Sequence, residues 1–427
     1  MAESVSPIIQ TCLEDHLMTD SSLQPRVRPA LIANLLGQIA FGLVVMTICL
    51  PSMQEWSRIF DTDQAGVQLT FSGYVATYGV LQLIYGPMSD RYGRRAVLVA
   101  GLVLALLGSV MGALATDLTV LTLARVVQGM GGAAGMVVGR SMVHDLFTGA
   151  DRTRMMAYIG MTLGVCPPTA TIIGGFLHVH VGWQANFVLA ALLSLLLLVA
   201  AWRGLPVRAA AAHASEKTLA AAESSWHVLR DMLSAYRQLL GERSFMMYLL
   251  ILSMTTATFY TVLGGAPIVL KSYGVGPDGV GWYVMFGPLS YIVGNFMTSR
   301  FIHLRGEKRV MVWGQLLSMS SGLMMALLSL LGWHAPMAFA LPLLLLGFGH
   351  GLLVPPALAG SIGLLPALAG SAAGAIGLMQ QWTGAFGGYS VGWVSHENAT
   401  NLGFLMMLFT SFSLVAQAFL NRWRFKK

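Results

Sequence analysis

The chain has 427 residues, of which 56% are hydrophobic and only 10% are charged, and its mean hydropathy is +0.68. Because soluble domains carry about 25% charged residues, this composition excludes a soluble protein and indicates a surface that faces lipid. The net charge of +7 does not indicate a nucleic-acid partner, since the basic residues gather in short loops between apolar segments. The cysteines, Cys12, Cys49 and Cys166, lie far apart, so we expect no disulfide framework, no metal site and no cofactor.

Twelve apolar segments are long enough to span a bilayer, which takes about 20 helical residues. Six lie near 30–51, 66–88, 95–115, 119–143, 155–177 and 184–203, and six near 245–269, 279–302, 309–332, 336–357, 371–394 and 400–421. Residues 204–244 form the one long polar stretch between them. We predict an all-α polytopic membrane protein with two six-helix bundles, 30–203 and 245–421, a central cytosolic loop 204–244, and cytosolic tails 1–29 and 422–427.

The distribution of basic residues gives an orientation. Of the 25 Lys and Arg residues, we place all but three on the side of the N-terminus; the exceptions are Arg58 and Lys271 on the opposite side and Arg125 within the fourth span. Cytosolic loops of membrane proteins carry an excess of Lys and Arg. Both termini are therefore expected in the cytosol, and the first 29 residues, which lack an apolar core, are expected to be a tail and not a signal peptide.

The second span ends in the run Gly-Pro-Met-Ser-Asp-Arg-Tyr-Gly-Arg-Arg, residues 86–95. Gly86 and Gly93 permit close backbone approach and a positive φ, which a tight turn between two helices requires. Asp90 lies among Arg91, Arg94 and Arg95, where charge-assisted hydrogen bonds are strong. The alternative is a basic loop that only sets the orientation of the protein in the membrane, but such a loop would not need the whole ten-residue pattern.

This run resembles the signature loop of the major facilitator superfamily, which joins the second and third spans. Residues 125–133, RVVQGMGGA, resemble the fourth-span arginine motif of its drug:proton antiporters. Residues 142–147, with the glycines at 174–175 and the run 182–187, resemble the Bcr/CflA group of multidrug exporters. The resemblance implies a rocker-switch exporter, not an enzyme, that works as a monomer in a bacterial inner membrane and exchanges small molecules for protons.

The resemblance also implies roles for charged residues. Asp90 would help to hold the cytosolic gate closed, and Asp145, at the end of the fourth span, could pair with Arg91 or Arg94. Arg125 would assist proton transfer. The alternative for Arg125 is a structural arginine bonded to backbone carbonyls, because an arginine within a span needs a partner.

The proton site is expected at a different residue from that of many relatives, which carry an acid in the first span. The run before Leu50-Pro51 has none, and no Asp or Glu lies in the middle of any span. His350 in the tenth span is the candidate, since histidine changes charge near neutral pH. The alternative for His350 is a neutral histidine hydrogen-bonded to a neighbouring helix. The proton site would then be Asp90, Asp117 or Asp145 at the rim.

The fifth span carries glycines and prolines that resemble the antiporter motif of exporters, where small residues allow close helix packing and prolines kink the helix. These residues are Gly160, Gly164, Pro167, Pro168, Gly174 and Gly175. Thr171 stands where the family usually has a second proline before the paired glycines.

A substrate cavity is expected along one face of the second span. Tyr74, Tyr78, Gln82 and Tyr85 share this face. Aromatic and amide groups suit flat, weakly polar or cationic compounds. Other candidate lining residues are Gln38, Gln380, Gln381 and Trp382, and for each of them an interhelical hydrogen bond is the alternative.

Other functions remain open at this point. A transporter of one metabolite, such as a siderophore, a sugar or an amino-acid derivative, would fit the missing first-span acid and favour neutral or zwitterionic substrates. An intramembrane enzyme would need clustered acids, histidines or a nucleophile with its base, which the spans do not offer. A receptor would not need the intact loop at 86–95.

Overall fold

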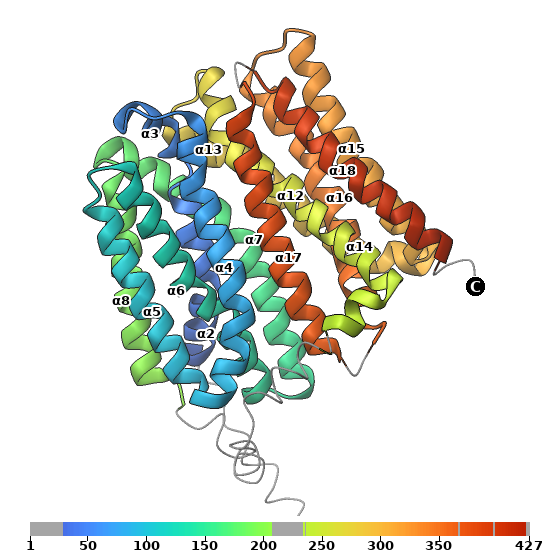
Figure 1. The fold of residues 1–427 in the computed structure, drawn as a ribbon, viewed down its shortest axis with the longest axis horizontal. Coiled ribbons are helices and arrows are strands. Elements are labelled where there is room, and N and C mark those ends of the chain that lie inside the picture. The colour runs from blue at the N-terminus through green and yellow to red at the C-terminus, as the bar shows by residue number, and fades with distance from the viewer. Residues whose placement is uncertain (1–28, 207–233, 235, 366–367, 396–397, 424–427) are drawn as a thin grey trace, which may run out of the picture.

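The structure is a computed structural model that describes residues 29–206, 234, 236–365, 368–395 and 398–423 (Figure 1). In the first half the helices are α2 (Pro29–Ile48), α3 (Met53–Ile59), α4 (Gln64–Tyr92), α5 (Arg94–Ala113), α6 (Leu118–Leu146), α7 (Gly149–His180) and α8 (Gln184–Gly204). In the second half they are α12 (Arg243–Ser272), α13 (Pro277–Val284), α14 (Phe286–Arg305), α15 (Glu307–Leu330), α16 (Pro336–Ile362), α17 (Ala369–Ser390), the 3-10 turn η3 (Val391–Trp393) and α18 (Thr400–Trp423).

The helices form two bundles, drawn from blue to green and from yellow to red in Figure 1. In the first bundle α6 packs against α4, α5 and α2, while α7 and α8 lie outside α2 and α5. In the second bundle α16 packs against α14 and α15, and α12 packs against α17 and α18. The bundles meet where α4 runs along α17 and where α7 packs against α13. The all-α architecture predicted from the sequence is therefore confirmed.

Twelve of the described helices have 20 residues or more and correspond in order to the predicted spans. Nine of these are also apolar enough to cross a membrane by length and composition. The other three, α4, α14 and α17, are less apolar. Two of them, α4 and α17, pack on each other between the bundles, and α14 touches α7. Their polarity fits helices that face protein on one side, so the count of twelve is consistent with the structure.

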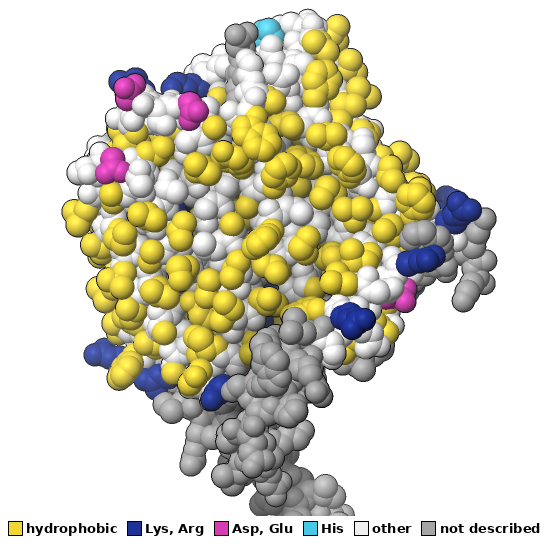
Figure 2. Space-filling view, viewed as in Figure 1, with side chains coloured by type: hydrophobic (Ala, Val, Ile, Leu, Met, Phe, Trp, Pro, Cys, Tyr) yellow, Lys and Arg dark blue, Asp and Glu magenta, His cyan; other side chains and the backbone are white. Residues whose placement is uncertain are grey.

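The surface has the pattern of a membrane protein. Figure 2 shows a broad band of hydrophobic side chains across the middle of one face, with Lys and Arg side chains at its margins. Large exposed apolar residues, such as Leu107, Leu196 and Phe296, belong to this kind of surface. In a soluble protein such patches would promote association, whereas in a bilayer they contact lipid.

One predicted span is interrupted. The eighth span, expected at 279–302, is divided into α13 and α14 at Met285. Pro288 has no N–H to donate to the carbonyl of Val284, and its ring crowds that carbonyl. Predicted ends and helix ends elsewhere differ by a few residues. The central loop and both tails lie largely outside the described residues, so the predicted division into domains stays a prediction.

Hydrogen bonds between the bundles are found, within the described residues, toward the end that carries α3 and α13, here called the α3 end. The Gln54 side-chain amide donates to the carbonyl of Pro267 at 2.7 Å, and Lys271 Nζ donates to the Gln54 carbonyl at 2.6 Å. The opposite end carries Arg91, Arg94 and Arg95 and is called the basic end. α7 contacts the second bundle near its α3 end, where a Cβ at Gly175 would collide with the Pro277 carbonyl oxygen.

Candidate functional site

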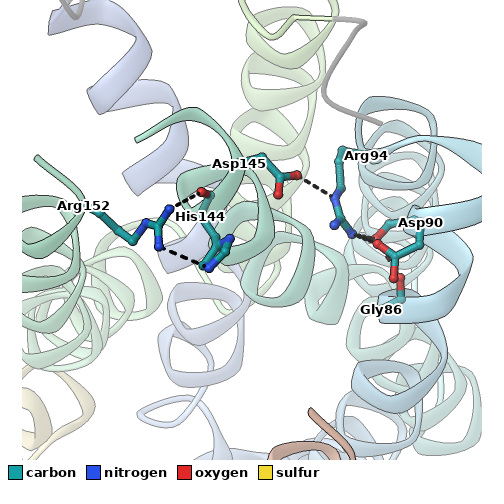
Figure 3. A network of polar contacts seen from close by, with 7 residues as sticks. Gly86, Asp90, Arg94, His144, Asp145 and Arg152 are labelled. Atoms are coloured by element: carbon teal, nitrogen blue, oxygen red, sulfur yellow. Dashed lines mark hydrogen bonds and ion pairs between the residues drawn. The ribbon is translucent and has the colours of Figure 1, made fainter. Parts of the chain in front are cut away.

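The signature loop forms an ion-pair network at the basic end of the first bundle (Figure 3). Gly93 has a φ of 94° and joins α4 directly to α5. Arg94, the first residue of α5, contacts Asp90 Oδ1 at 2.5 Å and donates to Ser89 Oγ at 2.6 Å. It also donates from Nε to Asp145 Oδ2 at 3.1 Å, which ties the loop to the end of α6. Asp145 thus pairs with Arg94 and not with Arg91.

The remaining arginines of this end also bind within the first bundle. Arg95 donates to the carbonyl of Trp202 and lies over its ring, with 5.0 Å from Cζ to the centroid. Arg91 lies over the Tyr92 ring at 5.5 Å. Arg152 donates to the Phe147 carbonyl at 2.9 Å, at the junction of α6 and α7. In the described residues these contacts fix the loop to its own bundle.

A second loop repeats this geometry in the other half, which the sequence reading missed. Gly306 joins α14 directly to α15 with a φ of 79° and a ψ of 154°, close to the 94° and 140° of Gly93. Only glycine adopts such backbone angles without strain. The run Leu304 to Arg309, LRGEKR, carries the signal, a glycine set among charged residues between two apolar segments.

Arg125 is buried, with 1% of its surface exposed, and binds the first span. It donates to the carbonyls of Val45 at 2.9 Å and Met46 at 3.1 Å, and to Oε1 of Gln128 at 2.9 Å. Its guanidinium also lies 4.4 Å from the centroid of the Tyr74 ring. This is the bonding expected of a structural arginine, and it compensates the buried charge without a carboxylate.

Three of the predicted cavity residues are engaged inside the first bundle. Gln38 donates to the Leu197 carbonyl on α8 at 3.0 Å. The Tyr74 hydroxyl donates to the Gly42 carbonyl at 2.6 Å, and the Tyr85 hydroxyl to the Met130 carbonyl at 2.9 Å. These three residues therefore make interhelical hydrogen bonds, which was the alternative to lining a cavity.

A polar cluster lies where the two bundles meet. The Tyr78 ring stacks on Tyr74 with 6.0 Å between centroids. The Gln381 side chain on α17 lies against Gly79 and accepts a hydrogen bond from the Tyr260 hydroxyl of α12 at 3.2 Å. Tyr260 also lies near Tyr78. Gln82, one turn after Tyr78, lies beside Gly377 of α17.

Two members of this site were missed by the sequence reading. Tyr260 was not singled out among the residues of an apolar span. Arg140 was placed with the cytosolic loop residues, but it lies in α6, near Tyr78 of α4. We call Tyr78, Gln82, Arg140, Tyr260 and Gln381 the central cluster.

Trp382 does not join the central cluster. It is 52% exposed and lies on one stripe of α17 with Met379 and Phe386, which are also exposed apolar residues. Such a stripe is the lipid-facing side of a spanning helix. The prediction that Trp382 lines the cavity is not supported by this placement. Its neighbour Gln380 donates to Thr256 Oγ1 at 3.0 Å and so links α17 to α12.

His350 lies in α16 and is buried, with 5% of its surface exposed. The glycines on either side of His350 pack closely against neighbouring helices. A Cβ added at Gly349 would lie 2.7 Å from the Gly314 carbonyl oxygen, and a Cβ added at Gly351 would lie 2.6 Å from the Tyr291 carbonyl oxygen. Within the described residues the His350 ring makes no hydrogen bond. The alternative interpretation, a neutral histidine hydrogen-bonded to a neighbouring helix, therefore does not match the structure.

The fifth-span motif packs tightly at one end only. A Cβ at Gly174 would collide with the Ile48 carbonyl oxygen, and one at Gly164 would lie 2.8 Å from Ile292 Cδ1. Gly160, nearer the basic end, has no atom within 4 Å of such a Cβ. α7 continues through Pro167 and Pro168 as one helix. Thr171 Oγ1 bonds the Pro167 carbonyl at 2.9 Å and helps to join α7 to α2.

Comparisons with known proteins agree with this arrangement. The family model of the Major Facilitator Superfamily matches residues 31–388. The chain is 29% identical over 359 residues to Multidrug resistance protein D of Escherichia coli, covering 82% of this chain and 85% of that protein. It is 25% identical over 376 residues to the Bicyclomycin resistance protein homolog of Haemophilus influenzae, covering 87% and 91%.

A solved structure of a peptide transporter superposes with a TM-score of 0.72 at 16% identity, covering 92% of this chain and 94% of that one. Similarity at this level shows the fold. The family model covers most of the sequence, and the signature loop, the two bundles and the fold all agree with it. The chain therefore belongs to the Major Facilitator Superfamily.

Proposed function

We propose that this protein is a secondary active transporter that exports drugs or amphipathic small molecules across a bacterial inner membrane. The sequence relatives support this class, because they are named for resistance to several drugs and to bicyclomycin. A shorter match, 30% identical over 183 residues, is to a Chloramphenicol resistance protein of Pseudomonas aeruginosa. It covers 42% of this chain and adds a relative that is named for resistance to another antibiotic.

The observation that carries the proposal is the central cluster, which joins α4 and α6 of one bundle to α12 and α17 of the other. Aromatic rings with a few polar groups suit ligands that are flat and only partly polar. Phe71 packs edge-on against Tyr260 with 5.8 Å between centroids, so aromatic contacts continue across the interface. A site built from both bundles changes shape when the bundles rock against each other.

The described contacts are those expected of a state closed at the α3 end. With both termini in the cytosol, as the basic residues indicate, the α3 end faces away from the cytosol. The Gln54 and Lys271 hydrogen bonds would then form the closed outer gate. Asp90 and Arg94, at the basic end, would belong to the gate that forms when the protein opens outward.

Proton exchange is proposed as the energy source. Of the groups that change charge near neutral pH, His350 is the one that lies at depth in the second bundle. Arg125 holds the first span by its carbonyls, so we assign it the positioning of α2 and not a direct proton transfer. The protein is proposed to work as a monomer, because both bundles contribute to the central cluster within one chain.

Drug accumulation in cells that lack their own exporters tests the proposal. Cells that express the protein should accumulate less of several amphipathic antibiotics and tolerate more of them. Gln381→Ala should change the range of compounds, and Trp382→Ala, at the next position but facing lipid, should leave it unchanged. A wild type that exports a single metabolite and no drug would favour the dedicated transporter, and no change in any accumulation would refute export.

A further inference from the structure

We infer that His178 and Glu55 form a proton-binding site that stabilises the closed outer gate. His178 lies in the last turn of α7 and Glu55 lies in α3, so both belong to the α3 end of the first bundle. The inference rests on the outer gate of the proposed function but not on the identity of the exported compound. It adds a second site to His350, the proposed coupling group, which lies in the other bundle.

The His178 imidazole is buried and has a polar partner at each ring nitrogen. Its Nδ1 lies 3.1 Å from Ser52 Oγ, and its Nε2 lies 3.4 Å from Glu55 Oε2. A hydroxyl can donate or accept a hydrogen bond, so Ser52 can bond Nδ1 whether or not this nitrogen carries a proton. In the imidazolium, both N–H groups face an acceptor and the carboxylate balances the charge.

Ser52 and Asn186 hold the imidazole in this position, and both are fully buried. Ser52 precedes α3, yet its side chain makes no capping hydrogen bond to that helix. Its hydroxyl instead accepts from the Asn186 amide of α8 at 3.0 Å. The same amide donates to the Gly174 carbonyl of α7 at 3.2 Å. The cluster therefore ties together α3, α7 and α8 around the imidazole.

A proton can reach the pair from the α3 end. The Glu55 side chain is 35% exposed and the His178 side chain is 7% exposed, so the carboxylate lies between water and the buried ring. Arg58 also contacts Glu55, at 3.5 Å, but the Arg58 side chain is 78% exposed. Solvent screens such an exposed pair, which leaves the carboxylate available to an imidazolium.

The other charged groups of this end have different surroundings. Among the described residues, Glu55 is the only charged group that contacts His178. His180 bonds a carbonyl of its own helix, and Lys271 of α12 bonds the Gln54 carbonyl. The remaining acids of the neighbouring elements are Asp61 in the loop after α3, Asp63 and Asp117 at the caps of α4 and α6, and Asp278 in the first turn of α13.

The short helix that carries Glu55 also carries the outer gate. Gln54, the preceding residue, donates from its side chain to the Pro267 carbonyl of α12 at 2.7 Å, and its own carbonyl accepts from Lys271 at 2.6 Å. α3 has seven residues, about two turns, so an ion pair that holds one side of it also positions the other. Protonation of His178 therefore favours the closed gate. A proton taken up from outside would return an outward-open exchanger to the state described here.

Distance measurements across the outer gate test the inference on the purified full-length protein in nanodiscs, without any drug. Spin labels at Leu114→Cys and Leu331→Cys mark the α3 ends of α5 and α15, where both leucines are exposed. Cys12 and Cys166 are replaced by serine, and the buried Cys49 is kept. Lowering the pH from about 8 to about 5.5, across the range in which histidine changes charge, should raise the ratio of closed to open gates about fivefold.

Two substitutions each remove one partner of the pair. His178→Gln keeps a hydrogen-bonding side chain that does not change charge, and Glu55→Gln keeps the shape without the carboxylate. In both variants the ratio should become nearly independent of pH. His180→Gln is the matched control: His180 is exposed two residues after His178, and its substitution should leave the full response.

The wild type alone can overturn the inference, since a ratio that does not change with pH would do so whether or not the variants fold. A response that persists in His178→Gln or in Glu55→Gln would overturn it as well. Because the measurement needs no transport, a pH response in a protein that exports no drug leaves the site standing while the proposed function fails. Drug export with a gate that ignores pH removes this site alone.

Discussion

The Arg94 guanidinium, at the first residue of α5, donates to the Asp145 carboxylate at 3.1 Å and so joins the signature loop to the end of α6. Both side chains are largely buried, with 15% and 25% of their surface exposed. Because α6 also carries Arg140, this ion pair connects the loop to one of the four helices that contribute to the central cluster.

Asp145→Asn should therefore destabilise the first bundle slightly. The substitution keeps the shape and removes the charge, and for a partly buried pair we expect a loss of about 1 kcal/mol. The melting temperature in detergent, followed by size-exclusion chromatography, should fall by a few degrees. Asp151→Asn, an exposed acid in the first turn of α7, is the control and should leave the melting temperature unchanged.

Asp90→Asn tests the loop as a gate. Asp90 is the more exposed partner of Arg94, with 64% of its side-chain surface accessible, so its substitution should affect stability less than Asp145→Asn does. If the carboxylate stabilises the outward-open state, the rate of drug transport into everted vesicles should fall about tenfold, the effect of losing one charge-assisted hydrogen bond. An unchanged rate would contradict the gate role.

Arg125→Lys should destabilise the protein more than either of these substitutions. An ammonium group cannot reproduce the planar bonding to two carbonyls and an amide oxygen. Buried acceptors that lose their donor cost about 1–3 kcal/mol, and the contact with the Tyr74 ring weakens as well. Thermal unfolding measures the loss. Tyr74→Phe isolates one part of the network, since it releases only the Gly42 carbonyl. A lysine variant as stable as the wild type would show that these bonds contribute little.

Gly174→Ala and Gly160→Ala form a matched pair on α7. At Gly174 a Cβ would collide with the carbonyl oxygen of Ile48, so α7 must move away from α2 and the yield of folded protein should drop sharply. At Gly160 the same Cβ meets no atom within 4 Å, and alanine should be neutral or slightly stabilising. Equal effects at both positions would show that this packing does not depend on the missing side chain.

The sequence predicts the helices well because each span requires a long apolar run. The basic loops between the spans indicate which side of the membrane each helix end faces. It also predicts the contact of Asp145 with an arginine of the signature loop, since both lie at the same end of the bundle. Observed helix ends differ from the predicted ends where a single residue breaks the helix, as at Met285, where Pro288 interrupts the eighth span.

The composition of the central cluster could not be predicted as reliably, because it depends on helix rotation. Gln381 and Trp382 are adjacent, yet one contacts Tyr260 and the other faces outward. Arg140 was missed because an arginine near the basic end of a span resembles a loop residue until its helix and its neighbour Tyr78 are placed. The bonding of Arg125 depends on carbonyls of another helix, which no pattern of side chains reveals.

His350→Gln tests the proposed coupling to protons. Glutamine retains hydrogen-bonding capacity and similar size but does not change charge with pH, so drug transport by this variant should no longer respond to an imposed pH gradient, while drug binding persists. Drug accumulation in everted vesicles with and without the gradient measures this response. His180→Gln is the control, because His180 lies exposed at the end of α7 and bonds the Phe176 carbonyl of its own helix. A His350 variant that remains fully coupled would move the proton site to Asp90 or Asp145. Asp117, the third rim acid, would be the candidate at the α3 end, where its carboxylate accepts from the Val120 N–H at 3.0 Å and caps α6.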